Sequence, residues 1–307
     1  MNQLRLNLPL KTGLALPLAL LLSAAALLAG PAHAAGEDGS GAGLRERHAE
    51  LADQLNRNIF QRALYIDSAE APDGLKGDAY AVLDHPFATV RTALGSPANW
   101  CDVLILPFNT KYCRAQGSEA APSLMVRIGR KSDQPLKDAY PLTFAFHNVA
   151  SGADYFESRL AAETGPLGTR DYRIMLAATP LDAKRTFMHL SYSYGHGAAS
   201  RIAMQSYLAT IGAGKVGFTQ RGRNGDGEPV FIDGVRGAVE RNAMRYYLAI
   251  DAYLDSLNAP LAARVDRRIQ KWFTATEQYP RQLREMDRPT YVAMKRSEHA
   301  RQQSALD

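Results

Sequence analysis

Histidine and arginine side chains are the candidates for acid–base chemistry in this 307-residue chain. His189 and Arg173 lie in segments where apolar residues alternate, and His147 and His196 stand near the ends of two such segments. Histidine changes charge near neutral pH and is the usual general acid or base. No Ser or Cys nucleophile motif accompanies these residues, and Gly-x-Ser-x-Gly is absent from the sequence. Catalysis by His189 or Arg173 therefore remains an alternative, and structural roles are the main interpretation.

Metal and nucleotide motifs are incomplete in this sequence. No two histidines have His-x-x-x-His spacing, which a helical zinc site would use. Gly212-Ala213-Gly214-Lys215 is followed by Val216, where a phosphate loop requires Ser or Thr. Gly195-x-Gly197 likewise lacks the remainder of a dinucleotide signature. We expect neither a metal nor a cofactor.

The two cysteines, Cys101 and Cys113, are a candidate disulfide. Disulfides persist in oxidising compartments, and a chain exported to one favours this interpretation. A metal or redox pair is the alternative, but the spacing is too wide for Cys-x-x-Cys and no histidine cluster lies nearby. A loop this short would stabilise the fold by about 2–3 kcal/mol if the bond is unstrained.

A further group of side chains is suited to binding an amphipathic molecule. Tyrosine offers an apolar ring and a hydroxyl that needs a partner when buried. Arg241 and Arg245 lie one helical turn apart and could hold a carboxylate or phosphate. Core packing, and ion pairs with Glu240 or Asp251, are the alternative roles. The residues predicted to line a pocket are Phe144, Phe146, Tyr172, Ile174, Met188, Leu190, Tyr192, Tyr246, Ile250 and Tyr253.

Period-two alternation of apolar residues predicts the strands that would carry most of these side chains. Short turns such as Leu181-Asp182-Ala183-Lys184 separate the alternating segments, which favours an antiparallel sheet. The enzyme alternative would require His189 or Arg173 to face into the pocket beside Tyr192. The predicted strands cover residues 78–83, 123–130, 141–149, 155–160, 170–178 and 186–194.

Helical spacing predicts the remaining elements. The strongest pattern covers residues 234–257, where Val239, Ala243, Tyr246, Ile250, Tyr253 and Leu257 form one apolar stripe. Asp84 and Pro86 are typical of a helix start. Residues 35–43 are predicted to be a flexible linker, 96–99 a turn and 221–228 an exposed loop. The other predicted helices cover residues 44–64, 86–94, 198–211, 261–277 and 288–303.

Residues 1–34 have the three parts of a cleaved secretory signal. Arg5 and Lys11 precede an almost pure Leu/Ala run, and Pro31-Ala32-His33-Ala34 supplies the cleavage pattern. An uncleaved anchor is the alternative, but the run is near the lower limit for a bilayer span. No later segment is apolar enough to span a membrane, so we predict a periplasmic protein without a transmembrane span. Removing the charges of Arg5 and Lys11 lowers the net charge from +5 to +3, too little to indicate nucleic-acid binding.

The order of elements resembles the START-like superfamily, also called helix-grip or SRPBCC. The local resemblance lies in residues 79–87, Val90, Leu94 and Asn99-Trp100, and the whole match covers residues 76–257. It implies an α+β fold in which a curved antiparallel sheet grips a long C-terminal helix, with extra N- and C-terminal helices. It also implies a cavity between sheet and helix that holds a lipid, sterol, polyketide or other apolar molecule. Because one fold hosts many functions, this is an analogy.

Three other stretches, residues 100–104, 109–113 and 241–247, resemble a group of exported proteobacterial proteins with no assigned activity. This resemblance supports a periplasmic location and nothing about chemistry.

We therefore predict a signal peptide (1–34), a linker and N-terminal helix (35–75), a helix-grip domain (76–257) and a C-terminal helical extension (258–307). The predicted function is non-catalytic binding or transport of an apolar or amphipathic small molecule such as a lipid. One alternative is a cyclase or hydrolase on the same fold. Another is a cell-envelope interaction module that docks a protein through Trp272, Phe273 and Tyr279.

Overall fold

The computed structural model describes residues 39–197, 200–202, 204, 206 and 212–304. The predicted signal peptide and most of the predicted helix over residues 198–211 lie outside the described residues. Within the described ranges, no helix is long and apolar enough to cross a bilayer.

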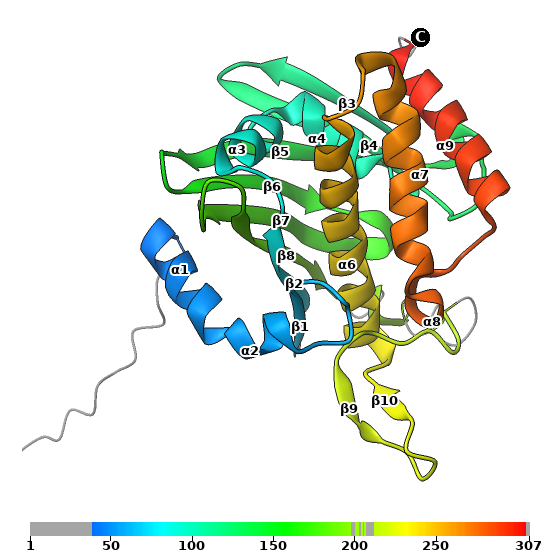
Figure 1. Cartoon of the computed structure of the whole chain (residues 1–307). Helices are drawn as coiled ribbons and strands as arrows, with labels where there is room; N and C mark the ends of the chain where they lie inside the picture. Colours follow the sequence, from blue (N-terminus) through cyan, green and yellow to red (C-terminus); the bar gives the residue numbers. More distant parts are fainter. Residues whose placement is uncertain (1–38, 198–199, 203, 205, 207–211, 305–307) are drawn as a thin grey trace, which may run out of the picture. The chain divides into compact units, whose positions relative to one another are not determined.

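An eight-stranded antiparallel sheet is the centre of the fold, with strand order β1-β2-β8-β7-β6-β5-β4-β3 (Figure 1). β2 and β8 are far apart in the sequence, and their pairing runs from Gly74–Gly195 to Leu83–Thr186. β1 and β3 form the two edges. The strands are β1 (Leu64–Ala71), β2 (Gly74–Leu83), β3 (Thr110–Ser118), β4 (Ala121–Ile128), β5 (Tyr140–Ser151), β6 (Phe156–Thr164), β7 (Thr169–Pro180) and β8 (Thr186–His196).

The long helix α6 (Gly234–Ser256) lies on one face of this sheet, where it contacts β1, β2 and β8. α4 (Pro97–Leu104) and α7 (Arg264–Glu277) flank it, with α3 (Phe87–Leu94) near its C-terminal half (Figure 1). α9 (Arg288–Gln303) packs on β3 and α7. The predicted fold class, a curved sheet packed around a long C-terminal helix with extra helices, is confirmed.

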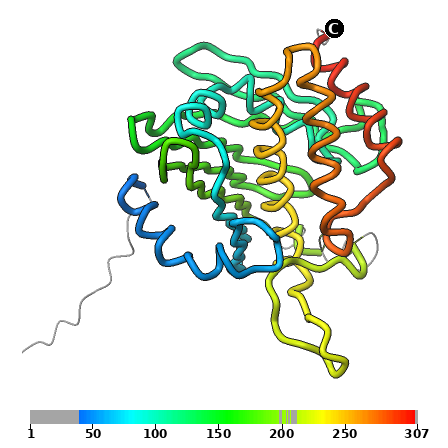
Figure 2. The backbone as a smooth tube through the Cα atoms, in the orientation of Figure 1, coloured from blue at the N-terminus to red at the C-terminus, as the bar shows by residue number. Residues whose placement is uncertain are grey.

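Two N-terminal helices, α1 (Gly41–Glu50) and α2 (Ala52–Asn56), lie on the face of the sheet opposite to α6. There α1 contacts β7 and β8. Short elements complete the chain: η1 (Leu136–Asp138), η2 (Pro166–Gly168), η3 (Leu261–Ala263) and α8 (Pro280–Leu283). The hairpin of β9 (Gln220–Arg223) and β10 (Pro229–Phe231) forms its own two-stranded sheet and extends away from the large one (Figure 2).

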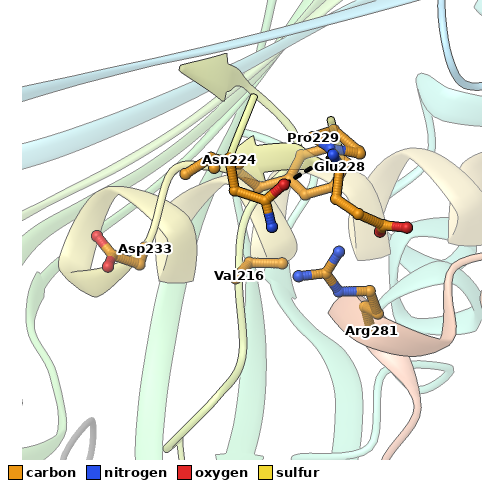
Figure 3. A pocket seen from close by; sticks show the side chains of 8 residues that line it. Val216, Asn224, Glu228, Pro229, Asp233 and Arg281 are labelled. Atoms are coloured by element: carbon orange, nitrogen blue, oxygen red, sulfur yellow. Dashed lines mark hydrogen bonds between the residues drawn. The ribbon is translucent and has the colours of Figure 1, made fainter. Parts of the chain in front are cut away.

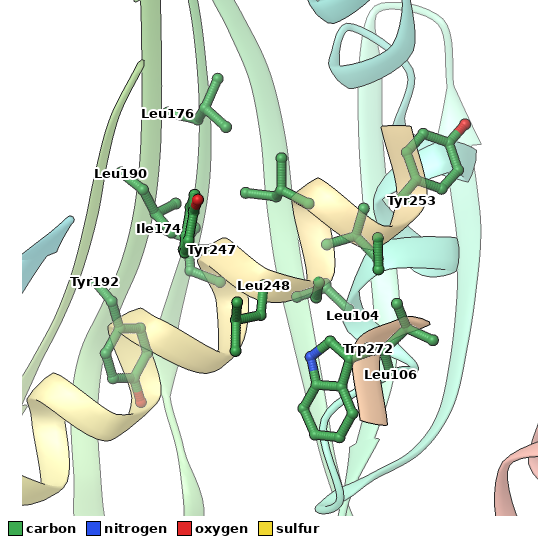
Figure 4. Close-up of a cluster of buried hydrophobic side chains, with 14 of the residues drawn as sticks. Leu104, Leu106, Ile174, Leu176, Leu190, Tyr192, Tyr247, Leu248, Tyr253 and Trp272 are labelled. Atoms are coloured by element: carbon green, nitrogen blue, oxygen red, sulfur yellow. The ribbon is translucent and has the colours of Figure 1, made fainter. Parts of the chain in front are cut away.

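Alternation along β8 separates two apolar clusters. Met188, Leu190 and Tyr192 belong to the main core beneath α6, whereas Phe187 joins α1 and α2 on the other face. Figure 4 shows strand side chains of the main core, among them Leu190 and Tyr192, on the side of the sheet that faces α6. The pattern that predicted the strand therefore also sorted its side chains between the two faces.

All six predicted strands are confirmed, as are the helices predicted over residues 86–94, 234–257, 261–277 and 288–303, with small shifts at their ends. The predicted linker 35–43 already contains the start of α1, because Ser40 accepts a hydrogen bond from the Gly43 N–H (3.0 Å) and caps the helix. The turn predicted at 96–99 is the first turn of α4, with Pro97 at its first position.

Two strands of the large sheet were missed because polar residues occupy their buried positions. The helix predicted over 44–64 ends at Asn56, and β1 follows with Ser68 buried in line with Leu64 and Ile66. β3 begins with Thr110 and Lys111, both buried. The sheet thus begins before residue 76, the predicted boundary of the helix-grip domain. The predicted loop 221–228 is exposed, but its first three residues belong to β9 and the rest connects β9 to β10, two strands that were also missed.

Candidate ligand-binding cavity

A cavity of about 60 Å³ lies between the sheet and α6. Strands β4, β5, β7 and β8 line it from one side, and Tyr246 of α6 lines it from the other. The segment between α4 and β3 closes part of it. The lining is mostly apolar, with aromatic, amide and hydroxyl groups: Leu104, Asn109, Thr110, Val126, Ile128, Leu142, Phe144, Pro166, Tyr172, Tyr192 and Tyr246.

Three tyrosines dominate the wall of this cavity. The ring centroids of Tyr192 and Tyr246 are 5.3 Å apart, and those of Tyr172 and Tyr192 are 6.3 Å apart. Tyr194 extends the group by stacking on Tyr172 at 5.3 Å. Burial raises the pKa of all four hydroxyls, so each keeps its proton at neutral pH. Each hydroxyl can therefore both donate and accept a hydrogen bond.

The β6–β7 turn covers Tyr172 and contributes Pro166 to the cavity wall. The Thr169 Oγ1 and the Tyr172 hydroxyl are 2.9 Å apart, and the Gly165 N–H donates to the Thr169 carbonyl at 2.8 Å. A side chain at Gly165 would collide with the Tyr172 ring, so this approach requires glycine. Leu167 (φ 57°) is left-handed and 72% exposed. A non-glycine residue held this way costs on the order of 1–3 kcal/mol, so the closed turn is strained.

Four of the predicted pocket residues line the cavity, namely Phe144, Tyr172, Tyr192 and Tyr246. The other predicted residues are buried in the core away from it, and Tyr253 packs beneath the Arg268 guanidinium. The missed lining residues are of two kinds. Val126, Ile128 and Leu142 share the inward alternation of Phe144 and could have been found from that pattern. Leu104, Thr110 and Pro166 lie at the ends of other elements, and Asn109, a polar residue in an apolar stretch, was open to a role at a pocket mouth or in capping a loop.

The two predicted headgroup arginines are both buried. Arg245 donates to Glu285 Oε1 at 2.6 Å, and Arg241 donates to the Val216 carbonyl at 3.2 Å. Arg245 thus pairs with Glu285, an acid that the sequence did not point to. Glu240 instead accepts hydrogen bonds from Ser68, Phe218 and Thr219, which ties β1 to the segment before β9.

The residues of the alternative enzyme hypothesis, His189 and Arg173, lie on the opposite face of the sheet from Tyr192. His189 Nε2 is 2.7 Å from Asp78 Oδ1, and its ring stacks on Tyr80 at 4.2 Å. Arg173 is exposed. Neither side chain therefore reaches the cavity, and His189 forms part of a buried polar contact between β2 and β8.

The residues of the predicted protein-docking surface, Trp272, Phe273 and Tyr279, are all buried. The Trp272 ring stacks on Tyr291 at 5.2 Å, and its Nε1–H donates to the Arg245 carbonyl at 3.1 Å. Tyr279 donates to the Phe60 carbonyl at 3.0 Å. These aromatic groups attach α7 and α8 to the main core, so they are not available at the surface.

Cys101 and Cys113 form a disulfide with their Cα atoms 5.1 Å apart, which confirms the predicted pair. The bond joins α4 to β3. The cavity-lining residues Leu104, Asn109 and Thr110 all lie within the loop that it closes. The disulfide therefore braces one wall of the cavity.

A second concavity, an open groove of about 560 Å³, lies at the base of the β9–β10 hairpin (Figure 3). The Arg281 guanidinium lies 5.4 Å from the centroid of the Phe231 ring at this groove. Most of its lining is exposed, so a ligand there would keep much of its surface in water, unlike one in an enclosed pocket. The lining residues are Val216, Asn224, Glu228, Pro229, Val230, Phe231, Asp233 and Arg281. Among the described residues, no group of three or more His, Cys, Asp or Glu is placed to hold a metal.

Comparison with known proteins gives distant structural likenesses. No family model and no curated protein matches the sequence. A norcoclaurine synthase mutant from Thalictrum flavum is 12% identical over 48% of this chain and 83% of its own, with a TM-score of 0.31. The Zhui aromatase/cyclase from Streptomyces sp. R1128 is 14% identical over 44% of this chain and 72% of its own, with a TM-score of 0.30.

A conserved protein from Geobacillus kaustophilus is 10% identical over 59% of this chain and 95% of its own, with a TM-score of 0.34. Likenesses at this level assign neither a family nor a function to this chain. The resemblance to exported proteobacterial proteins receives no support from these matches.

Proposed function

We propose that this protein binds a small amphipathic molecule, such as a lipid, in the tyrosine-lined cavity between the sheet and α6, without transforming it. The observation that carries the proposal is the convergence of Tyr172, Tyr192 and Tyr246 on one partly open cavity. The proposal places this binding in the periplasm, because residues 1–34 have a signal pattern and a disulfide is present. Fractionation of cells that make the full chain tests the location.

The chemistry of the lining supports an amphipathic ligand. Phe144, Val126 and Leu142 offer apolar surface to the body of such a molecule. The neutral hydroxyls of Tyr192 and Tyr246 can hydrogen-bond a single polar group. Small-molecule sites combine a largely apolar wall with few polar anchors in this way.

The size of the cavity sets a condition on this proposal. Pockets for drug-sized ligands measure about 300–1,000 Å³, several times the present 60 Å³. Binding of a lipid therefore requires the cavity to open. The strained turn with Leu167 at φ 57° is the element best suited to move, because release of the turn relieves the strain and uncovers Tyr172.

Calorimetric titration of the purified protein with dodecanoate and dodecanol tests the proposal. Val126→Phe would fill the cavity, and Met125→Phe is the matched control because the neighbouring residue points to the other face of β4. We expect the wild type and Met125→Phe to bind at least one of the two ligands, and Val126→Phe to lose that binding.

Two results would contradict the proposal. One is the absence of binding to the wild-type protein, together with native mass spectra that contain no co-purified small molecule. The other is equal affinity of Val126→Phe and Met125→Phe, which would place any binding outside the cavity.

A further inference from the structure

The polar residues that line the tyrosine cavity all have uncharged side chains. Among the residues that the structure describes there, they are three tyrosines, Thr110 and Asn109. Besides burial, ionisation of Tyr172 or Tyr246 raises the pKa of Tyr192, so the three phenol oxygens lie near one another. The hydrogen-bonding role that each phenol can still offer a ligand depends on the partners that it already has in the protein.

The Tyr172 hydroxyl uses its hydrogen within the protein. Thr169 Oγ1 donates to the Pro166 carbonyl at 2.5 Å, so the single hydrogen of the Thr169 hydroxyl is used there. Thr169 Oγ1 and the Tyr172 hydroxyl are 2.9 Å apart, and Tyr172 must therefore be the donor in this second bond. What Tyr172 can still offer a ligand is an oxygen that accepts a hydrogen bond.

The Tyr192 hydroxyl has the opposite arrangement. Asn242 Oδ1 accepts from Arg245 Nη1 at 3.4 Å, so the NH2 group of the Asn242 amide is the part that hydrogen-bonds the Tyr192 oxygen. Burial raises the pKa of Tyr192, and the contact with Asn242 acts to lower it, as expected when an N–H group donates to the phenol oxygen. The oxygen of Tyr192 is thus engaged, and its O–H hydrogen is what it can offer a ligand.

We infer that the tyrosine cavity selects an uncharged molecule with a hydroxyl group, which accepts a hydrogen bond from Tyr192 and donates one to Tyr172. This inference rests on the proposed function and adds the class of ligand, a long-chain alcohol. A carboxylate only accepts, so it would meet the oxygen lone pairs of Tyr172, and an ammonium only donates, so it would meet the Tyr192 hydrogen. Either ion would also lose its hydration against an uncharged wall, which costs far more free energy than burying a hydroxyl.

Calorimetric titration of the purified protein with four ligands that share a twelve-carbon chain tests the inference. Dodecanol donates and accepts, dodecyl methyl ether only accepts, and dodecanoate and dodecylammonium are charged. We expect dodecanol to bind at least about tenfold more tightly than either ion. It should bind about two- to tenfold more tightly than the ether, which corresponds to one hydrogen bond.

Two phenylalanine variants should separate the two hydrogen-bonding roles. Tyr172→Phe removes the acceptor, so it should weaken the binding of dodecanol and leave the binding of the ether unchanged. Tyr192→Phe removes the donor, so it should weaken the binding of both ligands. Tyr65→Phe is the matched control, because Tyr65 stacks on Tyr80 on the outer face of the sheet, and it should bind every ligand like the wild type.

A gain of binding provides a test that a folding defect cannot imitate. Thr169→Val removes the acceptor of the Tyr172 hydrogen, so Tyr172 becomes able to donate to the ligand. The ether should then bind more tightly than it does to the wild type, and the preference for dodecanol over the ether should shrink. An unchanged preference would contradict the assigned direction of the Thr169–Tyr172 bond and overturn the inference.

The inference and the proposed function fail in different ways. Equal affinity for dodecanol and the two ions, or tighter binding of either ion, would overturn the selection of a hydroxyl and leave the proposed function intact. No binding of any of the four ligands would remove the proposed function. Equal losses of affinity for dodecanol and the ether in Tyr172→Phe would show that Tyr172 acts through packing, which would also overturn the inference.

Discussion

Buried polar side chains occur in two regions of this core: lysines between α9 and the start of β3, and tyrosines between α6 and the sheet. Lys111 and Lys295 both pair with Glu298, at 3.0 Å and 2.7 Å, and all three side chains are at most 1% exposed. Lys111 Nζ also donates to the Phe108 carbonyl, and Lys295 Nζ donates to the carbonyls of Pro107 and Thr110. The side chains of Tyr172, Tyr192 and Tyr246 instead line a cavity.

This difference separates a polar cluster that holds the fold from one that is available to a ligand. Desolvated charges persist only when they are paired and hydrogen-bonded, and the Lys111–Glu298–Lys295 cluster meets that condition without any ligand. It fixes α9 on the segment that leads into β3. Neutral hydroxyls cost less free energy to bury than charged groups do, so the tyrosines can line a cavity with little loss of stability.

Loss of Glu298 is expected to have the largest effect on stability. Glu298→Gln leaves two buried lysines without their carboxylate, and breaking a buried pair in this way costs about 3–5 kcal/mol. Urea denaturation measures the change, with the exposed Glu119→Gln as the control. A change below about 1 kcal/mol, the value typical of surface pairs, would mean that the cluster does not hold α9 in place.

Removal of the disulfide should lower the free energy of unfolding somewhat less than loss of Glu298 does. It should also weaken binding in the tyrosine-lined cavity. The Cys101→Ser, Cys113→Ser double variant lacks the loop constraint and should lose about 2–3 kcal/mol. The same loop supplies Leu104, Asn109 and Thr110 to the cavity, so ligand affinity should fall as well. A stability loss with unchanged affinity would show that this wall of the cavity is not needed for binding.

The two regions should respond to alkaline pH in opposite directions. Burial lowers the pKa of Lys295 to about 8, from 10.5 in an ordinary lysine, despite the opposing charge of Glu298. Between these values the unfolded state binds more protons, so stability should rise with pH through this window. Burial raises the pKa of Tyr246, so above about pH 10 the folded state retains more protons and stability should fall.

Urea denaturation at intervals from pH 7 to pH 11 measures both slopes. Lys295→Met should abolish the rise from pH 8, whereas Tyr246→Phe should weaken the later fall and leave the rise in place. Identical pH profiles for the wild type and Lys295→Met would contradict the assignment of the rise to this lysine.

Removal of single tyrosine hydroxyls should have the smallest effect on stability. Tyr192→Phe and Tyr246→Phe keep the rings and each loses at most about one ordinary hydrogen bond, or about 0.5–1.5 kcal/mol. Affinity for dodecanol should nevertheless fall, since its hydroxyl loses a partner in the cavity. Melting curves and calorimetry on the same samples separate the two effects, and unchanged affinity in both variants would assign the hydroxyls to the core.

Local patterns predicted the parts of this fold in which one face of an element is uniformly apolar. Alternation placed Tyr172 and Tyr192 on the inner face of the sheet, and the helical stripe placed Tyr246 opposite them. The same rule failed at β3, because its buried Lys111 pairs with Glu298 near the other end of the chain. A pattern read over a short stretch of sequence cannot identify a partner that lies so far along the chain.

The size of the cavity was also beyond local patterns. Val126 and Leu142 follow the inward alternation, but whether they meet α6 or leave a void depends on packing between distant elements. Arg245 was predicted as a ligand group from its helix alone, and its partner Glu285 comes from a separate segment. Tertiary contacts therefore decided which predicted residues share a site.

A crystal structure of the protein with dodecanol tests the central claim most directly. The account predicts electron density for the ligand against Tyr172, Tyr192 and Tyr246, a cavity well above 60 Å³ and a displaced turn at Gly165–Asp171. Ligand density at the β9–β10 groove, with the tyrosine cavity unchanged and empty, would contradict it.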